Sequence, residues 1–289
     1  FVTILENGRA LSGDETLGLM IGCNTTLASL GAVGTAVAAA PTIREGLQVL
    51  ENYSRLHATY IGVTLQSSLE GMSIKVSFLQ NIGEVERYHT EAGMMLLQHY
   101  LENISGRPLD YAMFQFAYQE PAYSNSYRTH LHSPCHFGSG SSSLELPRHW
   151  LAVRSPYYDP GLWRRSQLEL SQRIEELGAS SDQVYTQHLD SLLRSREPPL
   201  PDLGTIASGL HISERTLTRR LKREGTNFRE IRGRVLRSWA IEYLANTGDS
   251  VESIAAALGY QDAANFRRAF RSWENCSPGE YRDRISSSA

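Results

Sequence analysis

The sequence predicts two domains of different fold class. Residues 1–178 are expected to form an α+β sensor domain, with helices and a small mixed or antiparallel sheet, and residues 201–289 an all-α domain with two helix-turn-helix units. Helical and strand-like hydrophobic periods alternate before residue 178, whereas only helical period follows residue 201. The Pro-rich run 198–201 separates the two parts. One pattern also occurs twice in the last ninety residues, about 48 residues apart.

The composition is that of a folded protein with a local excess of positive charge. The 289 residues are 41% hydrophobic and 20% charged, which excludes a disordered chain and is enough for two cores. Residues 201–289 carry 14 Lys and Arg against 11 Asp and Glu, whereas residues 1–200 carry 14 against 20. Within residues 215–237 there are nine basic and two acidic residues. This excess favours contact with phosphate, although a charge run alone also describes a solvated helix face.

The cysteines and the apolar runs indicate the compartment. Cys23, Cys135 and Cys276 are far apart and lack CxxC spacing, so we expect neither a disulfide framework nor a structural zinc site. No run reaches the roughly 18–20 apolar residues that span a bilayer. The sequence therefore predicts a cytoplasmic protein without a membrane partner.

Three helices are predicted early in the first domain. The first runs from Phe1 to about Leu11. A capping box, Thr42 to Glu45, opens a second helix that ends near His57. A third has helical spacing over Val85–Ile104, with Gly106 just beyond its end.

Alternating runs predict the strands of the same domain. Tyr60–Leu65 and Met72–Leu79 are close enough to form a hairpin, and Tyr111–Tyr118 and Ser143–Leu146 are further strands. A helix over Leu162–Leu177 then closes the domain. Residues 179–200 are predicted to connect the domains by a helix that Ser181 caps, followed by the Pro-rich linker.

The first copy of the repeated pattern has the features of a helix-turn-helix unit. Ala207 is small where two helices must cross, residues 210–212 form the turn, and Ser213 can cap the next helix. On a helical wheel, Leu217 and Leu221 point together toward a core. The opposite face is mostly cationic and carries Arg215, Thr218, Arg219 and Lys222.

The second copy repeats this arrangement with aromatic core residues. Asp262 is the predicted cap, and Phe266, Phe270 and Trp273 point inward. Gly259 suits a left-handed turn position, which His211 would occupy in the first copy. The outer face carries Ala264, Arg267, Arg268 and Arg271. Between the copies, a predicted helix of about 17 residues would span about 25 Å and could hold both outer helices one DNA turn apart.

Motifs in both copies resemble the AraC/XylS family of bacterial transcription regulators. They are Ser213-Glu214-Arg215-Thr216-Leu217, Glu224-Gly225, Ile254-Ala255-x-x-Leu258-Gly259-Tyr260, Ala264-x-Phe266-x-Arg268-Ala269-Phe270-x-x-Trp273 and Ser277-Pro278-x-x-Tyr281-Arg282. The run Pro41-Thr42-x-x-Glu45-Gly46-Leu47 is similar to the arabinose-binding type of effector domain in one branch of that family.

The resemblance implies a ligand-responsive activator or repressor that reads two adjacent major grooves of promoter DNA. Its partners would be duplex DNA, a small-molecule effector and RNA polymerase, and a homodimer stays open. No cofactor is expected. The candidate DNA-binding residues are Arg215, Thr218, Arg219, Lys222, Asn265, Arg267, Arg268 and Arg271.

The effector pocket has a weaker sequence signal. Aromatic and Met side chains at sheet and helix positions could line it: Tyr53, Tyr60, Phe78, Met95, Phe116 and Tyr118. Core packing is the alternative for each of them. Such a lining would favour a hydrophobic or aromatic molecule, for example a fatty acid, over a sugar.

Two other classes of protein remain as alternatives. The sequence contains no GxSxG, Walker A, GxGxxG or HExxH motif, so an enzyme fused to a DNA-binding module is disfavoured. A zinc- or copper-responsive regulator could use His130, His132 and His136, because alternation in a strand would place the first two on one side. Pro134 breaks that register.

Overall fold

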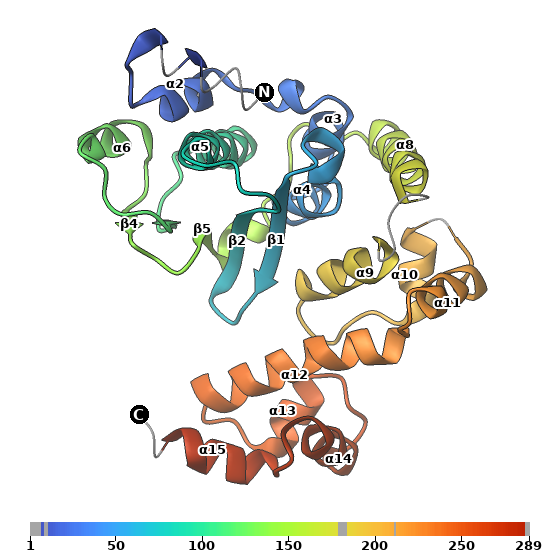
Figure 1. The fold of residues 1–289 in the computed structure, drawn as a ribbon. Helices are drawn as coiled ribbons and strands as arrows, with labels where there is room; N and C mark the ends of the chain where they lie inside the picture. Colours follow the sequence, from blue (N-terminus) through green and yellow to red (C-terminus); the bar gives the residue numbers. More distant parts are fainter. Residues whose placement is uncertain (1–6, 9–10, 179–183, 211, 287–289) are drawn as a thin grey trace. The chain divides into compact units, whose positions relative to one another are not determined.

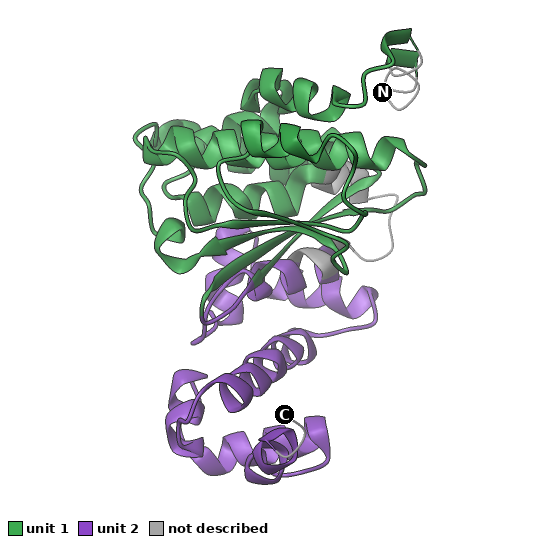
Figure 2. Cartoon of the chain, turned by 90° about the vertical axis from the view of Figure 1, so that its left-hand side faces the viewer, with its two compact units in different colours: residues 1–66, 70–179 green, residues 67–69, 180–289 purple. Residues whose placement is uncertain are grey.

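The computed structural model describes residues 7–8, 11–178, 184–210 and 212–286. The predicted helix from Phe1 to Leu11 therefore lies largely outside the described residues. The chain divides into two compact units (Figure 2). Unit 1 consists of residues 1–66 and 70–179, and unit 2 of residues 67–69 and 180–289.

A five-stranded mixed sheet forms the base of unit 1. Its strands are β1 (Ile61–Ser67), β2 (Gly71–Phe78), β3 (Met113–Phe116), β4 (Cys135–Phe137) and β5 (Ser142–Pro147), in the order β1-β2-β5-β3-β4. β5 pairs antiparallel with β2 and β3, and β3 pairs parallel with β4. The predicted mixed sheet is thus confirmed. β4 was not predicted, because its three residues are too few to show a period.

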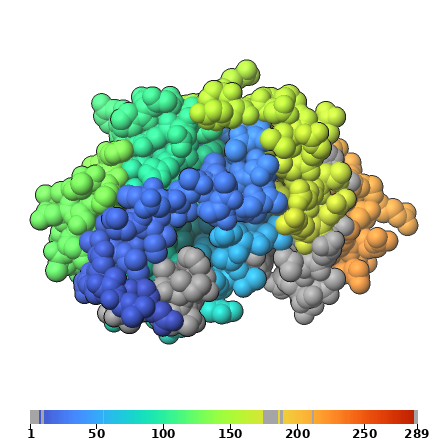
Figure 3. Space-filling model, turned by 90° about the horizontal axis from the view of Figure 1, so that it is seen from above, coloured from blue at the N-terminus to red at the C-terminus, as the bar shows by residue number. Residues whose placement is uncertain are grey.

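The helices of unit 1 form two layers over one face of this sheet (Figures 1 and 2). The inner layer contains α4 (Ile43–His57) and α5 (Val85–Ser105), and the outer layer α2 (Leu17–Asn24) and α3 (Ala32–Ala38). The remaining elements are the 3₁₀ helix η1 (Leu27–Leu30), α6 (Ser124–His130), α7 (Arg148–Leu151) and α8 (Pro160–Gly178). α8 packs against α3 and α4, beside which it lies in the space-filling view (Figure 3).

The start of α4 differs in detail from the predicted capping box. The Thr42 side chain accepts no hydrogen bond from the helix backbone and instead bonds the Glu45 carboxylate. The first helical N–H, that of Ile43, donates to the carbonyl of Val153 at 3.1 Å. The helix therefore begins where predicted but without the predicted cap, and a tertiary bond satisfies its first free N–H.

Two glycines let α2 lie directly on α5. A Cβ at Gly18 would stand 2.7 Å from Cα of Tyr88, and a Cβ at Gly22 would stand 2.5 Å from Cβ of Met95. Both distances are shorter than real carbon contacts, so side chains at these positions would force the helices apart. This contact fixes the outer layer on the core.

Unit 2 is all-helical, as predicted. Its elements are α9 (Val184–Arg194), α10 (Leu203–Gly209), α11 (Glu214–Arg223), α12 (Phe228–Asn246), α13 (Val251–Ala257), α14 (Ala263–Glu274) and α15 (Pro278–Ser286). α10 with α11 and α13 with α14 are the two helix-turn-helix pairs, and α12 joins them (Figure 1). A helix of 19 residues is about 28 Å long.

The Pro-rich linker packs on the helix-turn-helix module. Leu200 is 6% exposed in the same core as Leu189 of α9. Gly259 has a φ of 82°, as its turn position requires, and a Cβ there would stand 2.9 Å from Cβ of Pro199. The connecting segment is therefore part of unit 2. His211, the predicted counterpart of Gly259, lies outside the described residues.

None of the helices in the described part of the chain is both long and apolar enough to cross a membrane.

Candidate nucleic-acid interface

α11 has one apolar face in the core and one cationic face in solvent. Ser213 accepts a hydrogen bond from the Thr216 N–H at 3.2 Å and so caps the helix as predicted. Leu217 and Leu221 are fully buried. The predicted outer side chains are all exposed: Arg215, Thr218, Arg219 and Lys222. Within the described residues, the three cations among them make no ion pair, so all three can bind an anionic partner.

α14 has the same polarity. Asp262 caps it by accepting from the Asn265 N–H at 2.7 Å, and Phe266 and Phe270 are fully buried. Trp273 is partly buried and stacks edge-on against Phe270. The exposed face carries Ala264, Arg267, Arg268 and Arg271.

Three polar side chains at the start of α14 form a chain of hydrogen bonds. The Asn265 amide donates to Asp262 Oδ2 at 2.7 Å, and its oxygen accepts from Arg268 Nη2 at 2.5 Å. The Arg268 guanidinium is therefore oriented before any partner binds, although it remains exposed. Arg267 instead pairs with Glu252 at 2.5 Å, with both side chains at least half exposed. Such a pair contributes little and can exchange for another anion.

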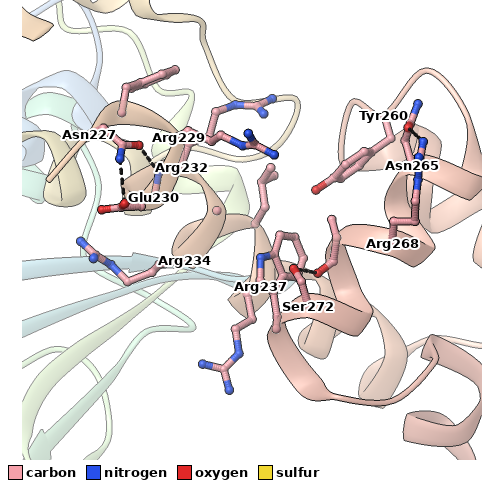
Figure 4. Close-up of a pocket in the computed structure, with 15 residues that line it drawn as sticks. Asn227, Arg229, Glu230, Arg232, Arg234, Arg237, Tyr260, Asn265, Arg268 and Ser272 are labelled. Carbon is pink, nitrogen blue, oxygen red and sulfur yellow. Dashed lines mark hydrogen bonds between the residues drawn. The ribbon is translucent and has the colours of Figure 1, made fainter.

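A groove with a volume of about 1380 Å³ runs between α12 and α14 (Figure 4). Arg229 and Arg232 lie on its α12 wall, and Tyr260, Asn265 and Arg268 on the opposite wall. Burial raises the pKa of the Tyr260 hydroxyl, an effect that the positive charge of Arg232 opposes. Asn265 and Arg268, both predicted to contact DNA, therefore lie on the same concave, basic surface as the arginines of α12.

Two further arginines of this groove have partners. Arg234 lies 3.6 Å from Asp190 of α9, and Arg237 pairs with Glu274 at the end of α14. In the sequence, these arginines stand out only as part of the basic excess of residues 215–237. Their common groove could not be predicted, because it needs α12 and α14 placed side by side.

α9 is bonded to the C-terminal end of α11. The Glu224 carboxylate accepts from the backbone N–H groups of Tyr185 and Thr186 at 3.0 and 2.7 Å. The Arg220 guanidinium stacks on the Tyr185 ring, 4.4 Å from its centroid, and donates to its hydroxyl. The connecting helix therefore contacts the helix that carries Arg219.

Comparison with known proteins agrees with both units. Residues 1–154 match the family described as the arabinose-binding domain of AraC transcription regulator, and residues 206–284 match a helix-turn-helix domain. The chain belongs to the AraC family of transcription regulators. It combines the N-terminal effector domain of these ligand-responsive proteins with their C-terminal DNA-binding domain, as predicted.

Several relatives of this AraC-family chain are similar over nearly its whole length. The ornithine utilization regulator of Pseudomonas aeruginosa is 28% identical over 98% of this chain and 83% of its own. VirS of Mycobacterium tuberculosis is 26% identical over the same shares. The crystal structure of CdpR from Pseudomonas aeruginosa has a TM-score of 0.52 at 23% identity, covering 97% of this chain and 91% of that chain, which shows the shared fold. All three of these proteins are named as regulators.

The six predicted effector residues fall in four places of the regulator's unit 1. Tyr53 is buried, and its hydroxyl lies 3.4 Å from Ser171 Oγ. Tyr60 and Phe78 both contact His89, Met95 packs under α2, and Phe116 and Tyr118 belong to an aromatic cluster. The Tyr60 hydroxyl forms a hydrogen bond of 2.8 Å with His89 Nε2, and the Phe78 ring packs edge-on against the His89 ring. Met95 lies against Gly22 of α2, and the Phe116 ring packs against that of Tyr118. They do not form one lining, and no observation assigns them to a ligand, so their role stays a prediction.

The predicted histidine cluster does not converge on one point. His130 Nδ1 lies 3.4 Å from Cys23 Sγ, whereas His132 Nδ1 lies 2.5 Å from Glu102 Oε1. His136 is exposed on β4. Among the described residues, no three His, Cys, Asp or Glu side chains are grouped to hold a metal ion. The geometry therefore gives the metal-responsive alternative no support.

Proposed function

We propose that α11 and α14 enter adjacent major grooves of promoter DNA while α12 keeps them apart. The observation that carries this proposal is the shared polarity of the two helices. In each, two large apolar residues are fully buried and the opposite face exposes cations and small polar groups. Outer faces of this chemistry suit phosphate and base edges.

Base recognition would be led by Arg219 on α11 and Arg268 on α14. An arginine fork can donate two hydrogen bonds to guanine O6 and N7, and each such pair discriminates by about 1–3 kcal/mol. Ala264 offers no polar group beside Arg268, so α14 would read fewer bases and depend more on phosphate contact. The remaining contacts are proposed for Arg215, Thr218, Lys222, Asn265, Arg267 and Arg271.

The basic groove would hold the DNA backbone between the two recognised grooves. Arg229 and Arg232 make no ion pair within the described residues, and they face Arg268 across the groove (Figure 4). Neutralising phosphates releases counterions and adds affinity without sequence preference.

Ligand control would come from unit 1. An effector can change the affinity for DNA only as far as the effector itself binds two conformations of the protein with different affinity. The same proposal includes RNA polymerase as a protein partner, action in the cytoplasm and a homodimer. These three points are supported by the family and not by a contact in the structure.

Footprinting tests the two-groove arrangement. Genomic fragments recovered with the full chain would be probed with a major-groove methylation reagent. We expect two protected tracts about 10 base pairs apart, one helical turn. A single tract, or two tracts on opposite faces of the duplex, would refute the arrangement.

A further inference from the structure

Unit 1 contains a pocket with a volume of about 340 Å³ that none of the six predicted effector residues lines. Its walls come from four stretches of the chain: the end of α2 with the segment that follows it, the end of α3, α5, and Tyr157. The volume is at the lower end of the range of about 300–1,000 Å³ typical of small-molecule sites.

The lining is apolar with a few neutral polar groups. Leu27, Ala38, Leu96 and Ile104 form the apolar part, together with the ring of the fully buried Tyr100. Polar groups come from threonine, cysteine, histidine and asparagine side chains, among them His99 and Asn103.

Charge decides which ligands fit. No Asp, Glu, Lys or Arg is among the described residues that line the pocket. A ligand with a full charge would lose its hydration there without gaining a counter-ion, which is unfavourable. A neutral molecule can bury apolar surface against the leucines and satisfy one polar group at His99 or Asn103.

We infer that this pocket is the effector site and that it takes a neutral, mainly apolar small molecule with one hydrogen-bonding end. This inference rests on the proposed ligand control of DNA binding and specifies its site.

The position of the pocket connects it to the last helix of unit 1. Ala38 ends α3, and α3 packs against α8. Tyr157 lies in the segment just before α8 and is 61% exposed. An occupant would therefore contact α3 and cover Tyr157, both next to the helix from which the chain continues into unit 2.

Cys23 provides a reporter for occupancy. It lines the pocket, is partly exposed, and its Sγ lies 3.4 Å from His130 Nδ1. Cys135 and Cys276 are also partly exposed but do not line the pocket. Peptide mass spectrometry after iodoacetamide treatment of the full chain measures all three rates in one sample.

The test uses indole and 1-octanol as neutral apolar probes and L-ornithine as a charged one. At about ten times its dissociation constant, a neutral probe should slow Cys23 alkylation about tenfold and leave Cys135 and Cys276 unchanged. Ala38→Leu fills the pocket and should abolish this protection. Ala28→Leu adds the same side chain at an exposed position of η1 outside the lining, and should retain it.

Three results would overturn the inference. The first is that neither indole nor 1-octanol protects Cys23 from alkylation. The second is that ornithine protects Cys23 as well as the neutral probes do, and the third is that a neutral probe still protects Cys23 in the Ala38→Leu variant. A melting curve of each variant shows whether it is folded. Because alkylation does not involve DNA, failure here is distinct from failure of the two-groove footprint.

Discussion

Glu224, which follows α11, accepts two hydrogen bonds from Thr186 near the start of α9, from the backbone N–H at 2.7 Å and from the side-chain hydroxyl at 2.6 Å. A carboxylate at the start of a helix, here α9, accepts from the free backbone N–H groups there and interacts favourably with the helix dipole. The connecting helix is thereby joined to one of the two helices proposed to read DNA.

Glu224→Ala should loosen α9. Charged hydrogen bonds contribute about 1.5–3 kcal/mol each, and partial exposure reduces this, so we expect unfolding of unit 2 to become easier by about 1–2 kcal/mol. Hydrogen exchange at the Tyr185 and Thr186 amides should accelerate. Asp249→Ala, which removes an exposed carboxylate before α13, should change neither. Unprotected Tyr185 and Thr186 amides in the unmodified chain would contradict this account.

Gly18→Ala should destabilise unit 1. The added Cβ would lie 2.7 Å from Cα of Tyr88 and 2.1 Å from Glu91 Oε2, so α2 must move off α5, at about 1–3 kcal/mol. Gly93→Ala is the matched control, because a Cβ at this position of α5 meets nothing within 4 Å. It should stabilise by about 0.5–1 kcal/mol. Chemical denaturation measures both, and equal effects of the two substitutions would argue against the close packing of α2.

Glu91→Gln should stabilise unit 1 more as the pH rises. Glu91 is fully buried and accepts from the Tyr123 and Tyr127 hydroxyls at 2.6 and 2.5 Å. Burial raises the pKa of its carboxyl despite these bonds. The folded state therefore holds the proton longer than the unfolded state, and its stability falls as the pH rises above about 4.3, the ordinary value for Glu.

The measurement is denaturation of both proteins between about pH 5 and pH 8. The gain of the Gln variant should grow across this range toward about 1.4 kcal/mol for each pH unit by which the pKa of Glu91 is raised. If the unmodified protein instead becomes more stable relative to the Gln variant as the pH rises, the folded state stabilises the ionised carboxylate. The pKa of Glu91 would then be lowered and not raised.

Arg229→Ala should weaken DNA binding uniformly. The lost phosphate contact should reduce the slope of log affinity against log salt by about 1, with the same factor for specific and unrelated sequences. Arg173→Ala removes the same charge from the exposed surface of α8 and should leave the slope unchanged. An unchanged slope for Arg229→Ala would remove the groove from the proposed interface.

The elements with a strong local pattern were predictable from sequence. α11 and α14 show large apolar residues at helical spacing opposite cations, and a cap residue before each, so their type, their first residues and their exposed faces were predicted. Most other helices and strands were found for the same reason, within a few residues.

Features that join distant parts of the chain were not predictable. The Glu224–Thr186 bonds connect residues 38 apart, and the basic groove needs two helices side by side. The same holds for the pocket beside Cys23, whose walls come from four segments. Aromatic residues such as Phe116 were therefore offered as pocket candidates, whereas the structure places Phe116 in a packed cluster.

Base-by-base affinity measurement tests the central claim most directly. Each position of the recovered site would be substituted in turn and titrated with the unmodified chain, Arg219→Ala, Arg268→Ala and Arg173→Ala. We predict that Arg219→Ala and Arg268→Ala each lose about 1–3 kcal/mol of discrimination, at different positions about one helical turn apart, and that Arg173→Ala loses none. Full discrimination in both variants, or loss at the same position, would contradict recognition by two separate helices.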